Sequence, residues 1–313
     1  MSARQDRPGD DGDGGQQGDD DHHDVQSAPL VLTKRVETHV ETVTRTGALS
    51  TVASVTWLKV ETVDSVRWLT IDRPDVKNAI PPDGWGPLGD AFTEFETSDD
   101  RVLVVTGSGG EFCSGAELDP GRIEGRANVT DNHRRMKLLE RAATALHRCT
   151  KPTIAAVDGV AVGAGMNLAL GCDVVIATDR ARFSEIFVRR GLTVDFGGTW
   201  LLPRVVGLQR AKELALSGRI VDAAEAESMG IAMEIVPKGR LIERADEVAR
   251  SFLVGAPLAQ MFAKKGIDTS FESSFAESLG WEGQSQSIAL ASEDAAEGTA
   301  AFLERRDPRW KGR

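Results

Sequence analysis

The stretch AAVDGVAVGAGMNLALGCDVVIATDRARF (155–183) decides the fold of this chain. It overlaps a buried strand, PTIAAVDG (152–159), and contains a second one, CDVVIAT (172–178). Between them, GAGMNLALG (163–171) has the apolar content of a buried helix. A strand, a helix and a strand in close succession predict a βαβ unit and a mainly parallel sheet.

The segments before this stretch extend the α/β pattern. TWLKVET and VRWLTID alternate as the strands of a hairpin that turns at Val63-Asp64-Ser65. RVLVVTG (101–107) is a third buried strand, and amphipathic helices are predicted over 86–97 and 132–149. From about residue 198 onward the pattern is almost entirely helical.

These patterns divide the chain into four parts. Residues 1–28 contain almost no apolar side chains, so we predict a disordered acidic tail. Residues 29–54 are β-prone with polar interruptions, and we assign them to a linker or an N-terminal extension. An α/β core over 55–255 and a helical C-terminal section over 256–313 complete the predicted chain.

Composition excludes several classes of function. The net charge is −11, and eight Asp against two Arg fall in residues 1–24, so nucleic acid and anionic membranes are not expected partners. No apolar run reaches the ~18 residues of a membrane span. The three cysteines form no CxxC pair, which favours a reduced, cytoplasmic setting. No HExxH or paired Cys/His set is present, so we expect no metal.

Two glycine-rich loops each come directly after a predicted buried strand: GSGGEFCSGAEL (107–118) and DGVAVGAGM (158–166). Loops at the same end of a parallel sheet converge on one crevice. The sequence has no GxxxxGK[ST], which excludes a P-loop, and no correctly placed GxGxxG. Two interpretations stay open: simple turn glycines, or an oxyanion hole built from one N–H of each loop.

At these residues the chain resembles the crotonase (enoyl-CoA hydratase/isomerase) superfamily, over about 250 residues. Besides the opening stretch, the resemblance is carried by IDRPDVKNAI (71–80), GEFCSGAELD (110–119), GGTWLLPRVVG (197–207) and EGTAAFLERRDPRWKGR (297–313). It implies a crotonase-like spiral of ββα units with a helical C-terminal trimerisation section. It also implies an acyl-CoA thioester as substrate, no further cofactor, and a homotrimer or hexamer.

The resemblance also implies roles for single residues. The two oxyanion donors fall on the N–H groups of Ala116 and Ala164, the latter following Gly163. Near the C-terminus, Phe302 and Arg305 match an aromatic and a basic residue that reach the CoA of a neighbouring subunit. Ordinary helix packing is the alternative for Phe302.

The carboxylates distinguish the reactions of this superfamily. Hydratases carry two glutamates, and the matching positions here are Asn167 and Phe187, neither of which transfers protons at neutral pH. Asp195 matches an aspartate of dienoyl-CoA isomerases and of the ring-epoxide isomerase of phenylacetyl-CoA degradation, the nearest branch. Its alternative is to cap the following helix. Glu185 lies two residues from Phe187 and is weighed as a lesser candidate.

We therefore hypothesise an enoyl-CoA isomerase of fatty acid metabolism. In it, Ala116 and Ala164 hold the enolate, Asp195 carries the proton, and Asn167 orients the substrate or fills a polar place in the core. The alternatives are an enoyl-CoA hydratase with atypical residues and a non-catalytic acyl-CoA-binding paralogue.

Overall fold

The computed structural model describes residues 55–118 and 128–313. The predicted acidic tail (1–28) and the predicted linker or extension (29–54) lie outside these residues.

The main sheet of the described chain has six strands in the order β1-β2-β3-β4-β6-β9. The first two form the predicted antiparallel hairpin, and the later neighbours all pair in parallel. Asp64 and Ser65 turn the hairpin with φ of 50° and 66°, the pattern of a tight two-residue turn. The strands are β1 Leu58–Val63, β2 Val66–Ile71, β3 Val102–Gly107, β4 Thr153–Val157, β6 Val174–Thr178 and β9 Glu234–Val236.

A second, three-stranded sheet has the order β5-β7-β8. It comprises β5 Val160–Val162, β7 Arg182–Ser184 and β8 Val221–Asp222. β5 begins three residues after β4 ends, so the chain passes directly from the main sheet into the second one. The second glycine-rich loop is therefore anchored by strands of both sheets.

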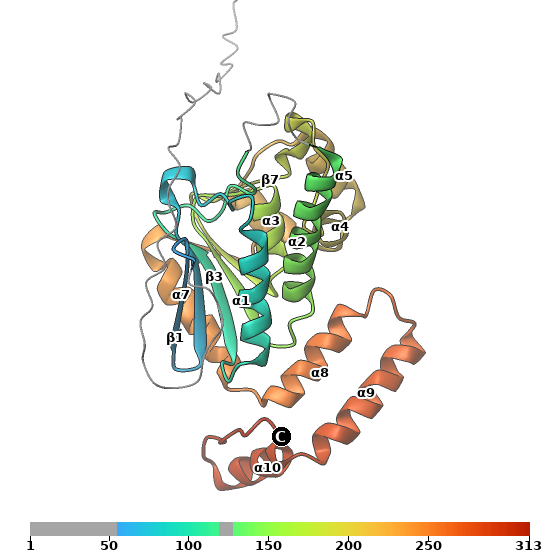
Figure 1. Cartoon of the computed structure of the whole chain (residues 1–313). Helices are drawn as coiled ribbons and strands as arrows, with labels where there is room; N and C mark the ends of the chain where they lie inside the picture. Colours follow the sequence, from blue (N-terminus) through green and yellow to red (C-terminus); the bar gives the residue numbers. More distant parts are fainter. Residues whose placement is uncertain (1–54, 119–127) are drawn as a thin grey trace, which may run out of the picture. The chain divides into compact units, whose positions relative to one another are not determined.

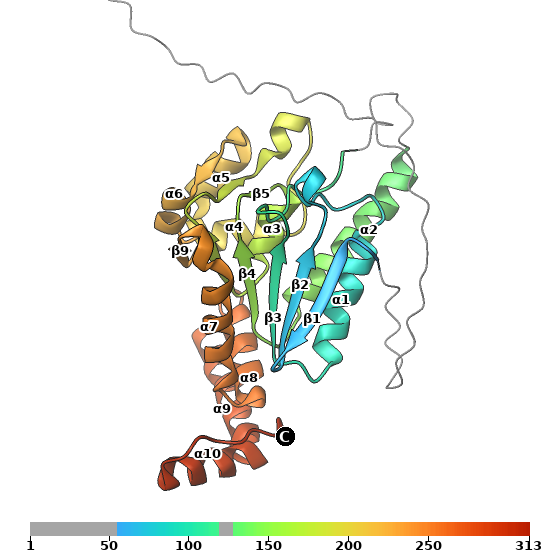
Figure 2. The same cartoon turned by 90° about the vertical axis from the view of Figure 1, so that its left-hand side faces the viewer.

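Helices cover both faces of the main sheet (Figures 1 and 2). Leu103 and Val105 of β3 point into one core with helices α1 and α2, whereas Val102 and Val104 point into another with α7. Burial on both faces explains why the central strands are almost continuously apolar. The helices of the core are α1 Trp85–Thr97, α2 Val129–His147, α3 Ala164–Leu170, α4 Gly198–Val206, α5 Leu208–Ser217, α6 Ala223–Met229 and α7 Leu241–Leu253, with 3-10 turns η1 Pro74–Val76, η3 Ile186–Arg190 and η4 Lys238–Arg240.

Three further helices come after the core: α8 Pro257–Asp268, α9 Phe275–Leu290 and α10 Glu293–Glu304. α8 is tied to the core, since Arg101 donates to the Gly255 carbonyl at 2.6 Å and Lys264 pairs with Asp173 at 2.8 Å. The expectation of an almost entirely helical pattern after residue 198 is wrong at β8 and β9, because β9 completes the parallel sheet beside β6. No helix in the described ranges is long and apolar enough to cross a membrane.

Candidate active site

The two glycine-rich loops leave the same edge of the sheet and pair with each other. β3 and β4 are parallel neighbours, so the loops after them begin side by side. Cys113 N–H donates to the Val160 carbonyl at 2.9 Å, and Val162 N–H donates to the Cys113 carbonyl at 3.0 Å. The loops are thus fixed to one another by backbone hydrogen bonds.

A glycine is required where the loops touch. Gly115 has φ of +90°, and a Cβ at this position would lie 2.8 Å from the Val162 carbonyl oxygen and 3.4 Å from Ala164 N. Only glycine fits such a position without moving the facing backbone. The residue that precedes Ala116 is therefore packed closely against the amide of Ala164.

The amides of Ala116 and Ala164 are the two predicted oxyanion donors. Neither N–H donates to a backbone acceptor within residues 55–118 and 128–313. Ala164 is the first residue of α3, where the helix leaves its N–H groups unpaired and carries partial positive charge. Two free donors on adjoining loops are the elements from which an oxyanion hole is built.

Glu117 has a structural role beside this site. Its carboxylate pairs with Arg73 at 2.8 Å, and its N–H donates to the Ile80 carbonyl at 2.8 Å. The pairing holds the first loop against the segment that comes after β2.

Asn167 lies on α3, fully buried, one turn after Ala164. Its Nδ2 donates to the Asp195 carbonyl oxygen at 3.0 Å and to Glu185 Oε2 at 3.4 Å. Its Oδ1 has no hydrogen-bond donor among the described residues. The side-chain amide therefore joins two segments that are distant in sequence.

Asp195 is half-buried, and its Oδ1 is an inaccessible atom without a described hydrogen-bond partner. Burial raises the pKa of this carboxyl to about 6, as expected from the apolar residues around it. The Asp195 side chain does not cap α4, but the Asp195 carbonyl oxygen accepts from Gly198 N–H at 3.0 Å at the start of this helix. Phe196 has φ of +49°, a strained value for a non-glycine residue, and packs on Trp85.

Glu185 joins this cluster, although it is only a lesser candidate on the residue types alone. It is 0% exposed, and its Oε1 has no partner in the described chain. Burial raises the pKa of Glu185 to about 7. The hydrogen bond from Asn167 acts in the opposite direction and lowers this pKa, and the charge of Asp195 raises it. Phe187, the residue at the second hydratase position, instead lies against Gly163.

A groove of about 480 Å³ runs between α2 and α4 and includes Asp195 in its wall. Its lining is mostly apolar, which suits a hydrophobic ligand. An adjoining groove of about 530 Å³ shares four of its residues, including His147 and Trp200, whose ring centroids lie 4.9 Å apart. The lining of the first groove is Met136, Leu139, Glu140, Ala143, Thr144, His147, Gly171, Asp195, Phe196, Gly197, Trp200 and Leu201.

Phe302 and Arg305 lie far along the chain, at the end of α10. Phe302 is 83% exposed, so it does not serve as packing within its own chain. Arg305 is the helix C-cap in a left-handed conformation. Neither residue lines the groove that contains Asp195.

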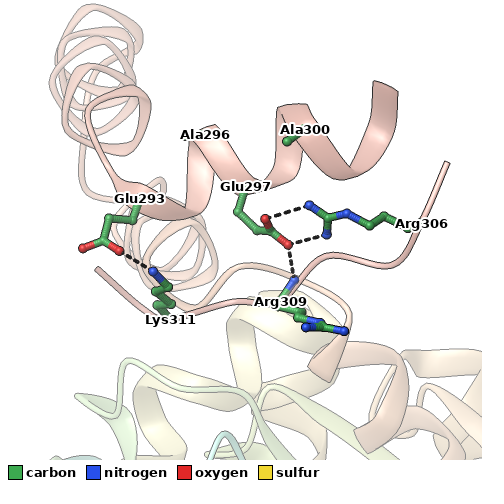
Figure 3. Close-up of a pocket in the computed structure, with 7 residues that line it drawn as sticks. All are labelled: Glu293, Ala296, Glu297, Ala300, Arg306, Arg309 and Lys311. Atoms are coloured by element: carbon green, nitrogen blue, oxygen red, sulfur yellow. Dashed lines mark hydrogen bonds and ion pairs between the residues drawn. The ribbon is translucent and has the colours of Figure 1, made fainter. Parts of the chain in front are cut away.

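The tail after α10 folds back on this helix and forms a cavity of about 740 Å³ (Figure 3). Glu297 accepts two hydrogen bonds from the Arg306 guanidinium, at 2.6 and 3.0 Å, and one from Arg309 N–H at 2.7 Å (Figure 3). This cavity is lined by α10 and the tail alone, and it contains neither Phe302, Arg305 nor any residue of the glycine-rich loops. The hydrogen bonds of Glu297 to Arg306 and Arg309 hold the C-terminal tail against α10.

Comparison with known proteins agrees with this geometry. The family described as Enoyl-CoA hydratase/isomerase matches residues 61–313. A Rhodobacter capsulatus protein named "Probable enoyl-CoA hydratase" is 37% identical over 260 residues, which cover 82% of this chain and 98% of the relative. The 1,2-epoxyphenylacetyl-CoA isomerase of Escherichia coli K12 is 34% identical over 246 residues, which cover 78% of this chain and 94% of the relative.

The fold leads to the same family. The crystal structure of an enoyl-CoA hydratase/isomerase from Cupriavidus metallidurans CH34 superposes with a TM-score of 0.74 at 36% identity, covering 83% of this chain and 97% of the other. The predicted crotonase fold and the family assignment made from the sequence are confirmed. This chain is an acyl-CoA enzyme that belongs to the enoyl-CoA hydratase/isomerase family.

Proposed function

We propose that this enzyme shifts a double bond in an enoyl-CoA thioester, with Asp195 as the single proton carrier. The observation that carries the proposal is the half-buried Asp195 carboxyl in the wall of the groove, whose Oδ1 is buried without a hydrogen-bond partner in the described chain. The two positions where a hydratase has glutamates are filled by Asn167 and Phe187. The similarity to an epoxyphenylacetyl-CoA isomerase supports an isomerase.

The reaction needs one base and a site for negative charge. Asp195 removes a proton from C2 of a 3-enoyl thioester, and the electron pair moves onto the thioester oxygen. The N–H groups of Ala116 and Ala164 donate to this oxygen, and each such donor stabilises the transition state by about 3–4 kcal/mol. Asp195 then returns the proton to C4, which places the double bond between C2 and C3. Positioned proton transfer adds a factor of about 10²–10⁴.

Asn167 has a supporting role in this scheme. Its Nδ2 is used by the Asp195 carbonyl oxygen and by Glu185. It therefore orients the loop that carries the catalytic carboxyl, and the thioester does not need to be its ligand.

The acyl group is expected to occupy the groove between α2 and α4. An apolar cavity of about 150 Å³ holds one benzene ring. A groove of about 480 Å³ therefore has room for a ring-bearing or medium-length acyl group.

The CoA moiety is expected to pass Gly163 and to meet Phe302 and Arg305 of a neighbouring subunit. The high exposure of Phe302 on α10 is consistent with a place in an interface between copies of the chain. We accordingly propose a homotrimer or a hexamer, with coenzyme A entering only as part of the substrate, and a cytoplasmic location.

Hydration is the second candidate, and two observations favour it. Most of the similar proteins are named hydratases, including the 37% identical Rhodobacter capsulatus relative. Glu185 and Asp195 are two carboxyl groups that interact electrostatically within one cluster, and such a pair can position and split water. Glu185 does not line the groove that Asp195 enters, and neither do Ala116 and Ala164. A non-catalytic acyl-CoA-binding paralogue is the third possibility, to be tested by activity.

The purified enzyme should be assayed with 3-enoyl-CoA for isomerisation and with crotonyl-CoA for hydration. Asp195→Asn keeps the shape of the side chain and removes its basicity, so isomerisation should fall by about 10²–10⁴-fold. Asp90→Asn, on the exposed face of α1, is the matched control and should keep full activity. Rapid hydration of crotonyl-CoA that Asp195→Asn leaves intact would refute the proposal, and acyl-CoA binding without turnover would favour the paralogue.

A further inference from the structure

We infer that Glu185 is a positioning residue that works in its protonated form, donating its O–H to Asn167 and so holding the Asp195 loop in place. This inference rests on the proposed role of Asp195. It assigns a function to a buried acidic group that the reaction itself does not use.

The position of Glu185 is unsuited to a charged side chain. It lies between β7 and η3, is 0% exposed, and receives one side-chain hydrogen bond among the described residues, the 3.4 Å contact from Asn167. A buried carboxylate without a cation is strongly disfavoured, and the usual response is to take up a proton.

Protonation of Glu185 would complete the hydrogen bonding of Asn167 and Glu185, because both groups retain an unpaired acceptor. Asn167 Nδ2 donates to Glu185 Oε2, while Asn167 Oδ1 and Glu185 Oε1 are both buried acceptors without a described donor. A protonated carboxyl supplies the missing donor. Its O–H donates to Asn167 Oδ1, and an acid–amide pair with two hydrogen bonds satisfies both groups.

Asn167 has little freedom to escape this pairing. Its amide lies flat against Gly198 at the start of α4, where an added Cβ would overlap it. The same Nδ2 also donates to the Asp195 carbonyl at 3.0 Å. Fixing Asn167 through Glu185 therefore fixes the backbone from which the Asp195 carboxyl projects.

Asp195 is the charged group that acts on Glu185. Arg189, on η3, is directed away and donates to the Ser217 carbonyl. Arg219, after the turn that ends α5, is engaged by two glutamates near the surface. The negative charge of Asp195 thus favours the protonated form of Glu185, and a neutral Glu185 spares Asp195 a like charge beside it.

The two ionisations open a working range of pH. Burial raises the pKa of Asp195 to about 6 and that of Glu185 to about 7, so Asp195 loses its proton before Glu185 as pH rises. Activity should rise as pH increases through about 6 and fall as pH increases through about 7.

Glu185→Gln tests the inference because glutamine mimics the protonated acid: its NH₂ donates to Asn167 Oδ1 and its oxygen accepts from Nδ2. We expect it to keep the activity of the wild type near pH 6.5 and to lose the fall at higher pH. At pH 8 the variant should be about tenfold more active than the wild type, since activity above a pKa of about 7 drops tenfold per pH unit. Glu185→Ala leaves the amide unpaired, so near pH 6.5 it should lose about tenfold or more relative to the wild type, and its activity should not fall further as pH rises to 8.

An inactive Glu185→Gln with a correctly folded Asn167 environment, or a variant that keeps the alkaline fall, would overturn the inference. Infrared difference spectroscopy gives a readout that does not depend on the reaction. Asp195 contributes a C=O band of its own at pH 6, so the readout is the spectrum of the wild type minus that of Glu185→Gln. This difference should show the C=O stretch of a buried protonated carboxyl at pH 6 and lose it by pH 8. If this band is present but no isomerisation occurs, the proposed reaction fails while the protonated Glu185 stands. If the band is missing, the inference fails whatever the reaction.

Discussion

Replacing Ala164 with proline removes one proposed oxyanion donor while leaving the fold intact. Ala164 is the first residue of α3, a position that proline accepts because the N–H it lacks has no intrahelical partner there. The preceding Gly163 has φ of 58° and ψ of −127°, an extended shape in the mirror-image region open to glycine, so the restriction that proline places on its neighbour is met. Gly163 keeps its own hydrogen bond to the Ser184 carbonyl.

The expected effect is set by the loss of one donor to the enolate oxygen. Such a loss costs about 3–4 kcal/mol in the transition state, which corresponds to a fall in kcat of about 10²–10³-fold. Single-turnover rates with a 3-enoyl-CoA measure this step directly. The Kd for a saturated acyl-CoA, measured separately, reports how far the proline ring hinders binding.

Leu208→Pro is the matched control. Leu208 is also the first residue of a helix, α5, follows a glycine of positive φ, and is 62% exposed. It should leave both kcat and the unfolding temperature close to those of the wild type. If Ala164→Pro keeps kcat within about tenfold of the wild type, or if Leu208→Pro lowers kcat as much, the oxyanion hole is not where we place it.

Two further predictions concern stability and acyl length. Because folded Glu185 keeps its proton up to about pH 7, the folded chain binds more protons than the unfolded chain between about pH 4.5 and 7, and the free energy of unfolding should fall by up to about 3 kcal/mol over this range. Glu185→Gln should remove this part of the decrease, as measured by urea unfolding at pH 5 and pH 8, and identical slopes in both proteins would contradict the raised pKa. Each methylene added to a saturated acyl-CoA should lower its Kd about fourfold until the acyl chain fills the first groove. Trp200 and His147 lie where the two grooves meet, so Trp200→Ala should let this trend continue to longer acyl chains. Met136→Ala widens the first groove alone and should leave the length at which the trend ends unchanged, so an equal shift in both variants would show that the ring pair sets no limit.

Much of the fold could be predicted from local patterns in the sequence. The hairpin, β3, β4, β6 and helices α1 to α3 have long apolar runs or clear periodicity, and the structure contains all of them. β9 was not predicted because it has three residues and lies in a largely helical region. It forms a strand by pairing with β6, which is distant in sequence. Local patterns carry no record of such pairing.

The place of Glu185 could not be predicted because it depends on a change of backbone conformation. Counting along an extended strand from Phe183 puts Phe187 at the catalytic position and Glu185 at a different depth. The chain instead leaves β7 at Ser184 and enters the 3-10 turn η3. This turn directs Phe187 toward Gly163 and leaves the Glu185 carboxyl beside Asn167. The sequence indicated that Glu185 lies near the site, but the direction of its side chain depends on the 3-10 turn η3.

The number of carboxyl groups that reach the groove bears directly on the reaction. Adding water across a double bond needs groups that activate the water and protonate the neighbouring carbon. In this enzyme Phe187, a residue without hydrogen-bonding groups, occupies the position matched to the second hydratase glutamate, and Glu185 is hydrogen-bonded to Asn167. In the proposed reaction, Asp195 is the one group that carries the proton, and it can return the proton to either C2 or C4. Return to C4 moves the double bond. Glu140 also lines the groove, but it is exposed and paired with Lys137, so Asp195 is the half-buried carboxyl of this groove and, as the one proton carrier, favours isomerisation.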